Sequence, residues 1–392
     1  MSIESECKTW GKISLLRAMC ALYDNGLLSA IPEDDLEKIK QITDYGDFYN
    51  KQKMSLGGAS NYIQVAFACA TMRERVGFEN DGMSPRILEK LGELAHSESP
   101  DGFTDEQPGY GRFDRYSFLL TSEISDSIYT AGGGDMPRWA EENLKLAADY
   151  ALFMANSRGD GFNYGRSLST HGDCAIAEVL SAALSRGLVP EEKIDLAYAY
   201  IAKIIDKTLT FWYSEEKRSF DIWWNGRSTN EYRHLHRLIE VNLDMCVHLM
   251  AILANLVRAG IEDKEPNYDL IPSPDAWVAR ELSFAENKSA ILLRRGERLV
   301  MLPLVGGGIR AKHAAYMPHP TICLEVEGAP EARMIIGTHG DGTKILPYNA
   351  RLETEIVTDG EYFFMTPHGM ITEATEVTFD TRGEIGYDIY LK

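Results

Sequence analysis

Apolar residues recur at three- and four-residue intervals from the start of the chain to about residue 260, as they do in amphipathic helices. This spacing predicts helices over residues 14–28, 61–78, 115–132, 139–157, 175–188, 192–213 and 237–260. Several of these segments end in glycine, which is favoured just after the carboxyl end of a helix. Some are apolar on nearly every side, which indicates a layer of helices packed between others.

The hydrophobic pattern changes after a linker at residues 262–277, which contains Pro266, Pro272 and Pro274 and has little periodicity. We therefore place a domain boundary near residue 275, with a helical domain over 1–274 and a second domain over 275–392. Short apolar runs bounded by turn residues predict strands in the second domain. These runs cover residues 289–296, 298–308, 321–328, 333–342, 352–369, 374–381 and 386–392.

The connections between the predicted helices are of two kinds. Some are short and plain, whereas others are long and rich in glycine, aromatic and charged residues, at 99–117, 157–173 and 215–237. Helical hairpins stacked side by side place alternate loops at opposite ends, so the long loops are expected to share one rim. The predicted fold is mainly α with a β part: an incomplete α/α toroid of helical hairpins followed by an antiparallel β-sheet or sandwich domain.

Net charge and targeting signals limit the expected partners. The formal net charge is −19 and no basic stripe offsets it, so nucleic acid is not an expected partner. No run of about 18 or more apolar residues occurs, so no membrane-spanning helix is expected. The first residues include acids and lack an apolar run that ends in small residues, which predicts a cytoplasmic protein. Homo-oligomerisation is left open.

The long connections hold the residues that carry candidate chemistry. Asn61 precedes an apolar helix, where it caps the helix or offers an amide to a ligand. The connection at 99–117 combines aromatic, guanidinium and carboxylate groups. These groups either stabilise the loop through ion pairs or line a binding site. Its candidates are Asp105, Glu106, Arg112, Asp114, Arg115 and Tyr116.

The stretch GDGFNYGRSLSTHGDC, residues 159–174, places polar groups beside glycines directly before a predicted helix. Glycine permits close approach of a ligand to the backbone. Tyr164 and Arg166 flank one glycine, and His171 and Asp173 flank another. A neutral His171 can accept a proton near pH 7. The alternative is that His171 and Asp173 only cap the helix that we expect to start near Cys174.

In the last long connection, Trp223 and Trp224 can stack against a sugar ring, and Arg227 and Arg233 can bind a carboxylate. His234 and His236 form an HxH pair, which alone is a weak signal for metal. Sequence signatures of nucleotide-binding loops are absent, and so is the HExxH signature of metalloproteases. Neither a metal nor a cofactor is expected. The six cysteines form no CxxC pair, which predicts mostly buried free thiols in a reducing compartment.

The segments SNYIQVAFACA and DGFTDEQPGYGRFDRYSFLL resemble the toroid polysaccharide lyases, a group that includes alginate lyases, chondroitin lyases and heparinases. The segment DGFNYGRSLS resembles a loop of uncharacterised α/α-toroid proteins related to these enzymes, and that related family is the alternative. Asn61 stands where these enzymes carry the asparagine that neutralises a uronate carboxylate, although Tyr62 replaces the usual histidine or tryptophan. The resemblance implies an enzyme that cleaves an acidic oligosaccharide or polysaccharide by β-elimination. It covers about residues 55–245, and the predicted β-domain is shorter than theirs.

The lyase interpretation assigns a role to each candidate. Amide and guanidinium donors neutralise the carboxylate and stabilise an enolate-like transition state. His171 or a tyrosine removes the proton, and Tyr116 or Tyr164 protonates the leaving oxygen. The expected catalytic residues are Asn61, Tyr116, Tyr164, Arg166 and His171. The expected substrate-binding residues are Arg112, Asp114, Arg115, Trp223, Trp224, Arg227 and His236.

Two other functions remain open from the sequence. A glycoside hydrolase on the same fold needs two carboxyl groups facing one bond, with candidates in Asp105, Glu106, Asp114 and Asp173. A sugar-binding helical protein without catalysis would keep its ligand affinity when Tyr164 and His171 are replaced.

Overall fold

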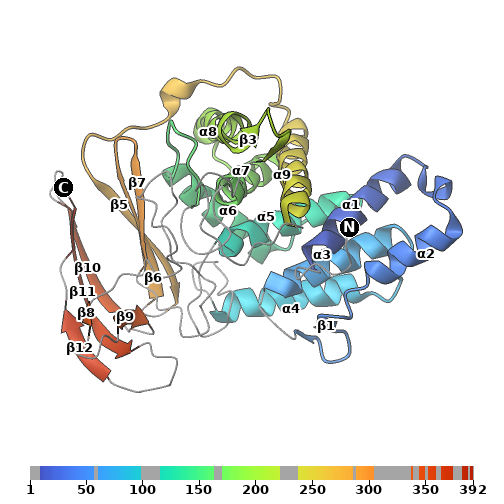
Figure 1. The fold of residues 1–392 in the computed structure, drawn as a ribbon, viewed down its shortest axis with the longest axis horizontal. Coiled ribbons are helices and arrows are strands. Elements are labelled where there is room, and N and C mark those ends of the chain that lie inside the picture. The colour runs from blue at the N-terminus through green and yellow to red at the C-terminus, as the bar shows by residue number, and fades with distance from the viewer. Residues whose placement is uncertain are drawn as a thin grey trace.

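The computed structural model describes residues 9–56, 61–98, 115–162, 170–220, 237–285, 288–303, 337–338, 344–348, 352–358, 363–373, 382–386 and 389–391. The described residues are mainly helical, with small antiparallel sheets (Figure 1). The α-helices are α1 (Trp10–Asp24), α2 (Glu33–Ile42), α3 (Asn61–Arg75), α4 (Met83–Glu98), α5 (Arg115–Thr130), α6 (Arg138–Phe153), α7 (Thr170–Ser185), α8 (Ile194–Lys207) and α9 (Arg237–Ala259).

The helices predicted from periodicity are confirmed, and two more are present. The prediction omitted α2 and α4. The prediction that the helix at 175–188 starts near Cys174 was wrong, because α7 already begins at Thr170. Three of the described cysteines, Cys20, Cys69 and Cys174, are buried free thiols as expected, whereas Cys246 is exposed.

The early start of α7 depends on a close backbone contact. The Phe162 N–H donates to the Gly172 carbonyl at 3.0 Å. A Cβ added at Gly161 would lie 2.5 Å from the Asp173 Cα. Only glycine allows the 159–162 segment to approach the first turn of α7 this closely, and the contact gives the Phe162 N–H an acceptor.

Helix α7 is the centre of the helical part, with every residue from Thr170 to Leu184 buried. It packs against α5, α6, α8 and α9, and α3 packs against α1, α4 and α5. The sequence predicted helices enclosed by others, and α7 is such a helix, because it is buried on all sides.

Neighbouring helices in the series α1, α3, α5, α7 and α9 pack side by side with their carboxyl ends together, so each runs in the same direction as its neighbour. Arg75 at the end of α3 pairs with Asp24 at the end of α1 at 2.7 Å, and it also lies against Gly132 just after α5. The Tyr129 hydroxyl in α5 donates to the Ser185 carbonyl in α7 at 3.2 Å. Asn255, near the end of α9, donates to Asp126 of α5 at 2.9 Å. The amino ends of these five helices therefore lie together at the opposite end.

The strands among the described residues form four antiparallel groups. Two ribbons consist of β1 (Tyr49–Asn50) with β2 (Ser55–Leu56), and β3 (Tyr213–Ser214) with β4 (Ser219–Phe220). A three-stranded sheet has the order β5 (Val278–Ala285), β6 (Lys288–Arg295) and β7 (Arg298–Pro303). A second sheet contains β8 (Gly337–Thr338), β9 (Lys344–Tyr348), β10 (Leu352–Thr358), β11 (Phe363–Glu373), β12 (Arg382–Gly386) and β13 (Ile389–Leu391).

The sheet β5–β7 lies beside the helices, and the second sheet lies farther from them (Figure 1). Strand β11 is the centre of the second sheet, because β9, β10, β12 and β13 all pair with it. The predicted runs at 321–328 and 374–381 lie outside the described residues. Strand β5 was not predicted, since the first predicted run begins only at residue 289.

Candidate functional site

The candidate site lies along the face of α7 that meets α9 and α5, starting at His171. His171 stands in the first turn of α7 and is 3% exposed. Its ring meets the ring of His248 on α9 edge to face, with ring centroids 5.8 Å apart. Glu178 follows His171 by seven residues, or about two helical turns, so both side chains project from one face of α7.

His248 is held by a carboxylate. Its Nδ1 is hydrogen-bonded to Glu178 Oε1, and both side chains are buried. A hydrogen bond at one ring nitrogen of histidine fixes its orientation and tautomer. Glu178 therefore fixes His248, and the ring of His248 packs against His171 at the amino end of α7.

A cluster of ionisable residues continues the site toward the carboxyl ends of the helices. Arg17 on α1 pairs with Glu123 on α5 at 2.8 Å. Burial alone would lower the pKa of Arg17, but the carboxylates of Glu123, Asp126 and Glu178 outweigh it and raise that pKa. Arg17 is therefore the cation around which three acidic side chains gather.

Asp126 is a member of this cluster whose pKa is strongly raised. Burial raises its pKa to about 7, and the neighbouring Glu123 and Glu178 carboxylates add to the rise. Arg17 and the amide of Asn255 act in the opposite direction without cancelling it. The interior thus holds a carboxyl group that exchanges its proton near neutral pH, a property common at functional sites.

Asp173 belongs to a separate ionic cluster on the other side of α7. Its Oδ1 accepts from the Gly161 N–H at 2.7 Å, and its Oδ2 accepts from Trp212 Nε1 at 3.0 Å. Lys207 Nζ lies 2.8 Å from Asp173 Oδ2 and 2.6 Å from Asp160 Oδ1. Because both oxygens of Asp173 bind groups of the protein itself, its role here is to tie the 159–162 segment and α8 to α7.

The other expected site residues are only partly described. Asn61 is the first residue of α3, and Arg115 and Tyr116 are the first two residues of α5. Their backbones therefore lie at the same end of the parallel helices as His171. The remaining candidates lie outside the described residues: Asp105, Glu106, Arg112, Asp114, Tyr164, Arg166, Trp223, Trp224, Arg227, Arg233, His234 and His236.

Sequence reasoning missed the interior part of the site. It considered residues in loops and at helix starts, whereas Glu123, Asp126, Glu178 and His248 stand in the middle of helices. The signal was present: each is an ionisable residue within an otherwise apolar helical stretch, and such residues are rarely fully buried unless they are paired. Among the described residues, no group of three or more His, Cys, Asp and Glu side chains is arranged to hold a metal ion.

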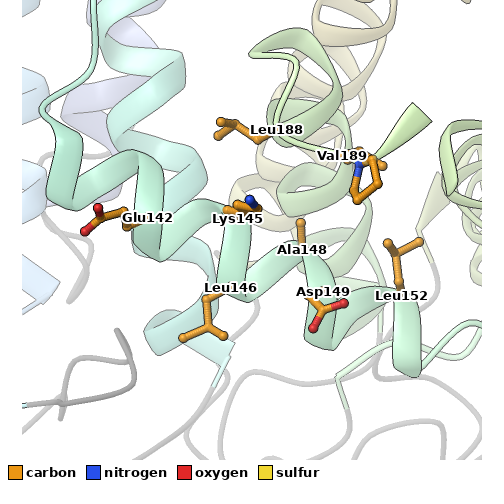
Figure 2. Close-up of a pocket in the computed structure, with 9 residues that line it drawn as sticks. Glu142, Lys145, Leu146, Ala148, Asp149, Leu152, Leu188 and Val189 are labelled. Atoms are coloured by element: carbon orange, nitrogen blue, oxygen red, sulfur yellow. The ribbon is translucent and has the colours of Figure 1, made fainter. Parts of the chain in front are cut away.

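A groove on the outer side of α6 is separate from this site. It has a volume of about 390 Å³. Figure 2 shows its lining residues on α6 and on the segment after α7: Glu142, Lys145, Leu146, Ala148, Asp149, Leu152, Leu188, Val189 and Pro190. Asp149 at its edge is already paired with Arg280 at 2.6 Å and with Lys193 at 3.3 Å. None of the lining residues belongs to the His171 site.

One described helix has the composition of a membrane span. The window Asn242–Ala259 in α9 is long and apolar enough to cross a bilayer by length and composition, and 28% of it is buried. Sequence reasoning did not mark this window because it considered only unbroken apolar runs. The window includes His248 and Asn255, which make buried polar contacts with α7 and α5.

Comparisons with protein-family models, with curated proteins and with solved structures found no match to this chain.

Proposed function

We propose that the protein is a carbohydrate-active enzyme, a lyase that cleaves a uronate-containing glycan by β-elimination. The observation that carries the proposal is the parallel alignment of α3, α5 and α7, which brings the starts of these helices to one end with His171 in the first turn of α7. The proposal includes the finer fold, in which the helical hairpins form an incomplete α/α toroid and the strands form a sandwich.

The aligned helix starts favour an acidic substrate. The amino end of a helix carries a partial positive charge and unpaired N–H groups, which together attract anions. Several such ends at one place give a locally positive region on a protein whose net charge is −19. In this proposal Asn61 and one of Arg112, Arg115 and Arg166 neutralise the uronate carboxylate there.

Elimination then needs a base and an acid. His171 accepts the C5 proton, the C4–C5 double bond forms, and the C4–O bond breaks. Tyr116 or Tyr164 donates a proton to the departing oxygen. The described contacts support His171 as the base, since the packed ring of His248, itself held by Glu178, restricts the orientation of the imidazole.

The contacts of Asp173 argue against its use in a hydrolytic carboxyl pair. Among the carboxyl groups considered for hydrolysis, Asp173 is the one whose side chain is described. Its oxygens bind Gly161, Trp212 and Lys207. A general acid or base must be able to reach the substrate, so Asp173 is not offered as one of a catalytic pair.

The test is to incubate the protein with alginate and chondroitin oligosaccharides in ¹⁸O-labelled water. Elimination yields an unsaturated sugar that absorbs in the ultraviolet and takes no oxygen from water. The variant His171→Gln is expected to lower kcat about 10²- to 10⁴-fold. The matched control is Ser181→Ala, an equally buried site on the same helix, which should keep its turnover.

Each alternative gives a different result. Label in the product without ultraviolet absorbance identifies a hydrolase and contradicts the lyase proposal. Binding of oligosaccharide without any product, unchanged in His171→Gln, identifies a sugar-binding protein and contradicts an enzymatic role.

A further inference from the structure

Gln64 on α3 is a buried polar residue whose amide makes no hydrogen bond to the described part of the chain. Its side chain is 0% exposed, and neither Nε2 nor Oε1 has a partner among the described residues. Burying an amide without hydrogen bonds is unfavourable, and few such groups occur in native proteins. An amide of this kind is explained when it is the binding group for a ligand.

The position of Gln64 indicates the charge of that ligand. Gln64 is the fourth residue of the 15-residue helix α3, and the first N–H groups of a helix have no acceptor within it. Helical side chains lean toward the amino end, so the amide is directed toward the positive end of the helix dipole. An amide donor beside a helix amino end favours an anionic group.

The side of α3 that carries Gln64 faces α1 and α5. Arg75 follows Gln64 by eleven residues, or about three helical turns, so both side chains project from the same side of α3. Arg75 pairs with Asp24 of α1 at 2.7 Å, and its guanidinium lies against Gly132 just after α5. Gln64 therefore projects toward the space between α1 and α5.

His171 projects toward the same space. The pair between Arg17 on α1 and Glu123 on α5 lies there, with a nitrogen–oxygen distance of 2.8 Å. Glu178, on the face of α7 that carries His171, helps to raise the pKa of Arg17, so this face is directed toward that pair. Gln64 and His171 thus approach one region from the first turns of α3 and α7, which both pack against α5.

We propose that Gln64 is a substrate-binding residue of the elimination site, an inference that rests on the function proposed above. Its Nε2 donates to the uronate carboxylate, and its Oε1 accepts from a hydroxyl group of the same sugar. An amide suits this task because it is both a donor and an acceptor. The site therefore selects a uronate whose hydroxyl groups are free over one that is esterified.

The burial of Gln64 determines how it differs from a structural residue. A sugar reaches the amide only after neighbouring side chains change rotamer, which is common on binding. Without a ligand the buried amide lowers the stability of the protein. An apolar replacement of similar shape should therefore stabilise the protein and weaken substrate binding, as is common for residues kept for function.

The first test compares Gln64→Met with Ser127→Ala in the full chain. Ser127 is also 0% exposed, and its hydroxyl has no hydrogen-bond partner among the described residues, but it stands near the carboxyl end of α5. Both variants are expected to raise the melting temperature. Only Gln64→Met is expected to raise KM for alginate or chondroitin tetrasaccharides, by about 10- to 100-fold, because it removes a hydrogen bond to a charged group.

The second test measures selectivity by titration calorimetry and does not depend on a variant of Gln64 folding. The background is His171→Gln, which keeps the sugars intact. The ligands are the same tetrasaccharides, forms with acetylated uronate hydroxyls, and forms with reduced carboxylates. Gln64 in place predicts at least about tenfold weaker binding of both modified forms. Adding Gln64→Met should reduce both differences.

The failure of this inference differs from the failure of the proposed function. If unsaturated product forms but KM is unchanged in Gln64→Met, or if acetylated and free tetrasaccharides bind equally, Gln64 does not bind substrate and the lyase proposal stands. A lowered melting temperature with unchanged KM identifies Gln64 as structural. If neither tetrasaccharide is bound or cleaved by the wild type, both proposals are contradicted.

Discussion

Asp126 shows how the surroundings of one residue change its chemistry. It stands on α5 inside the helical part, 4% exposed, with Arg17 as a nearby cation and with Glu123 and Glu178 as nearby acids. Removal from water disfavours the charged carboxylate, and two further acids add to that effect. The proton that Asp126 retains is thus a direct consequence of burial and of its neighbours.

This altered titration predicts how stability depends on pH. The folded pKa of Asp126, about 7, lies above the usual value of 3.8. Protonated Asp126 therefore stabilises the folded state fully below pH about 4. This stabilisation is lost as the pH rises toward 7. The variant Asp126→Asn cannot ionise. Between pH 4 and pH 7 its free energy of unfolding should therefore rise by roughly 2 to 4 kcal/mol relative to that of the wild type.

The measurement is denaturant unfolding of both proteins across this pH range. The difference between variant and wild type isolates residue 126 from the other titrating groups. A difference that is constant with pH would contradict a raised pKa at Asp126.

At the scale of elements, buried ion pairs connect α7 to its neighbours. Lys207 near the end of α8 lies between Asp160 and Asp173, and all three side chains are at most 10% exposed. Burial lowers the pKa of Lys207, but the two carboxylates outweigh it and raise that pKa. The lysine therefore stays charged, and it holds the 159–162 segment and α8 against the start of α7.

Removing the Lys207 ammonium should lower the free energy of unfolding. Lys207→Met leaves two buried carboxylates without their shared cation, and the expected loss is about 3 to 5 kcal/mol in the free energy of unfolding. The control is Lys203→Met on the same helix, where the ammonium lies 4.1 Å from the ring centroid of Tyr268 and the expected loss is at most about 1 kcal/mol. Chemical denaturation measures both, and equal losses would show that Lys207 has no special role.

At the scale of the whole molecule, the sheet β5–β7 is attached at the carboxyl end of α6. Arg280 on β5 donates to the Asp149 carbonyl at 3.2 Å and pairs with its carboxylate at 2.6 Å. Arg294 on β6 donates to the Phe153 carbonyl at 3.0 Å. Arginines are favourable at this position, because the last carbonyls of a helix lack partners and carry partial negative charge.

Arg280→Ala is therefore expected to loosen the sheet from the helices. The pair is partly exposed, so we expect a loss of only about 1 kcal/mol in the free energy of unfolding. Limited proteolysis should cut residues 260–277 several-fold faster than in the wild type. Arg138→Ala, which removes an exposed pair with Glu142 on the same helix, is the control. The same cleavage rate in both variants would contradict an attachment through Arg280.

The sequence by itself determined where seven of the described helices lie, although it did not reveal α2 and α4. The three- and four-residue spacing placed α3, α5 and α9 almost to the residue, because apolar spacing and helix-ending glycines are local properties of the chain. This spacing did not predict the start of α7. There the close contact with Gly161 accompanies a helix that begins before the apolar pattern does.

Only the tertiary structure decided which polar groups meet. His248 and Glu178 are 70 residues apart, and Arg17 and Glu123 are 106 apart, so no local pattern pairs them. The tertiary structure also decided which side of α9 is buried, since both of its sides are largely apolar in sequence. Such pairings follow from how the helices pack, because long-range contacts depend on the arrangement of elements and not on the spacing within any one of them.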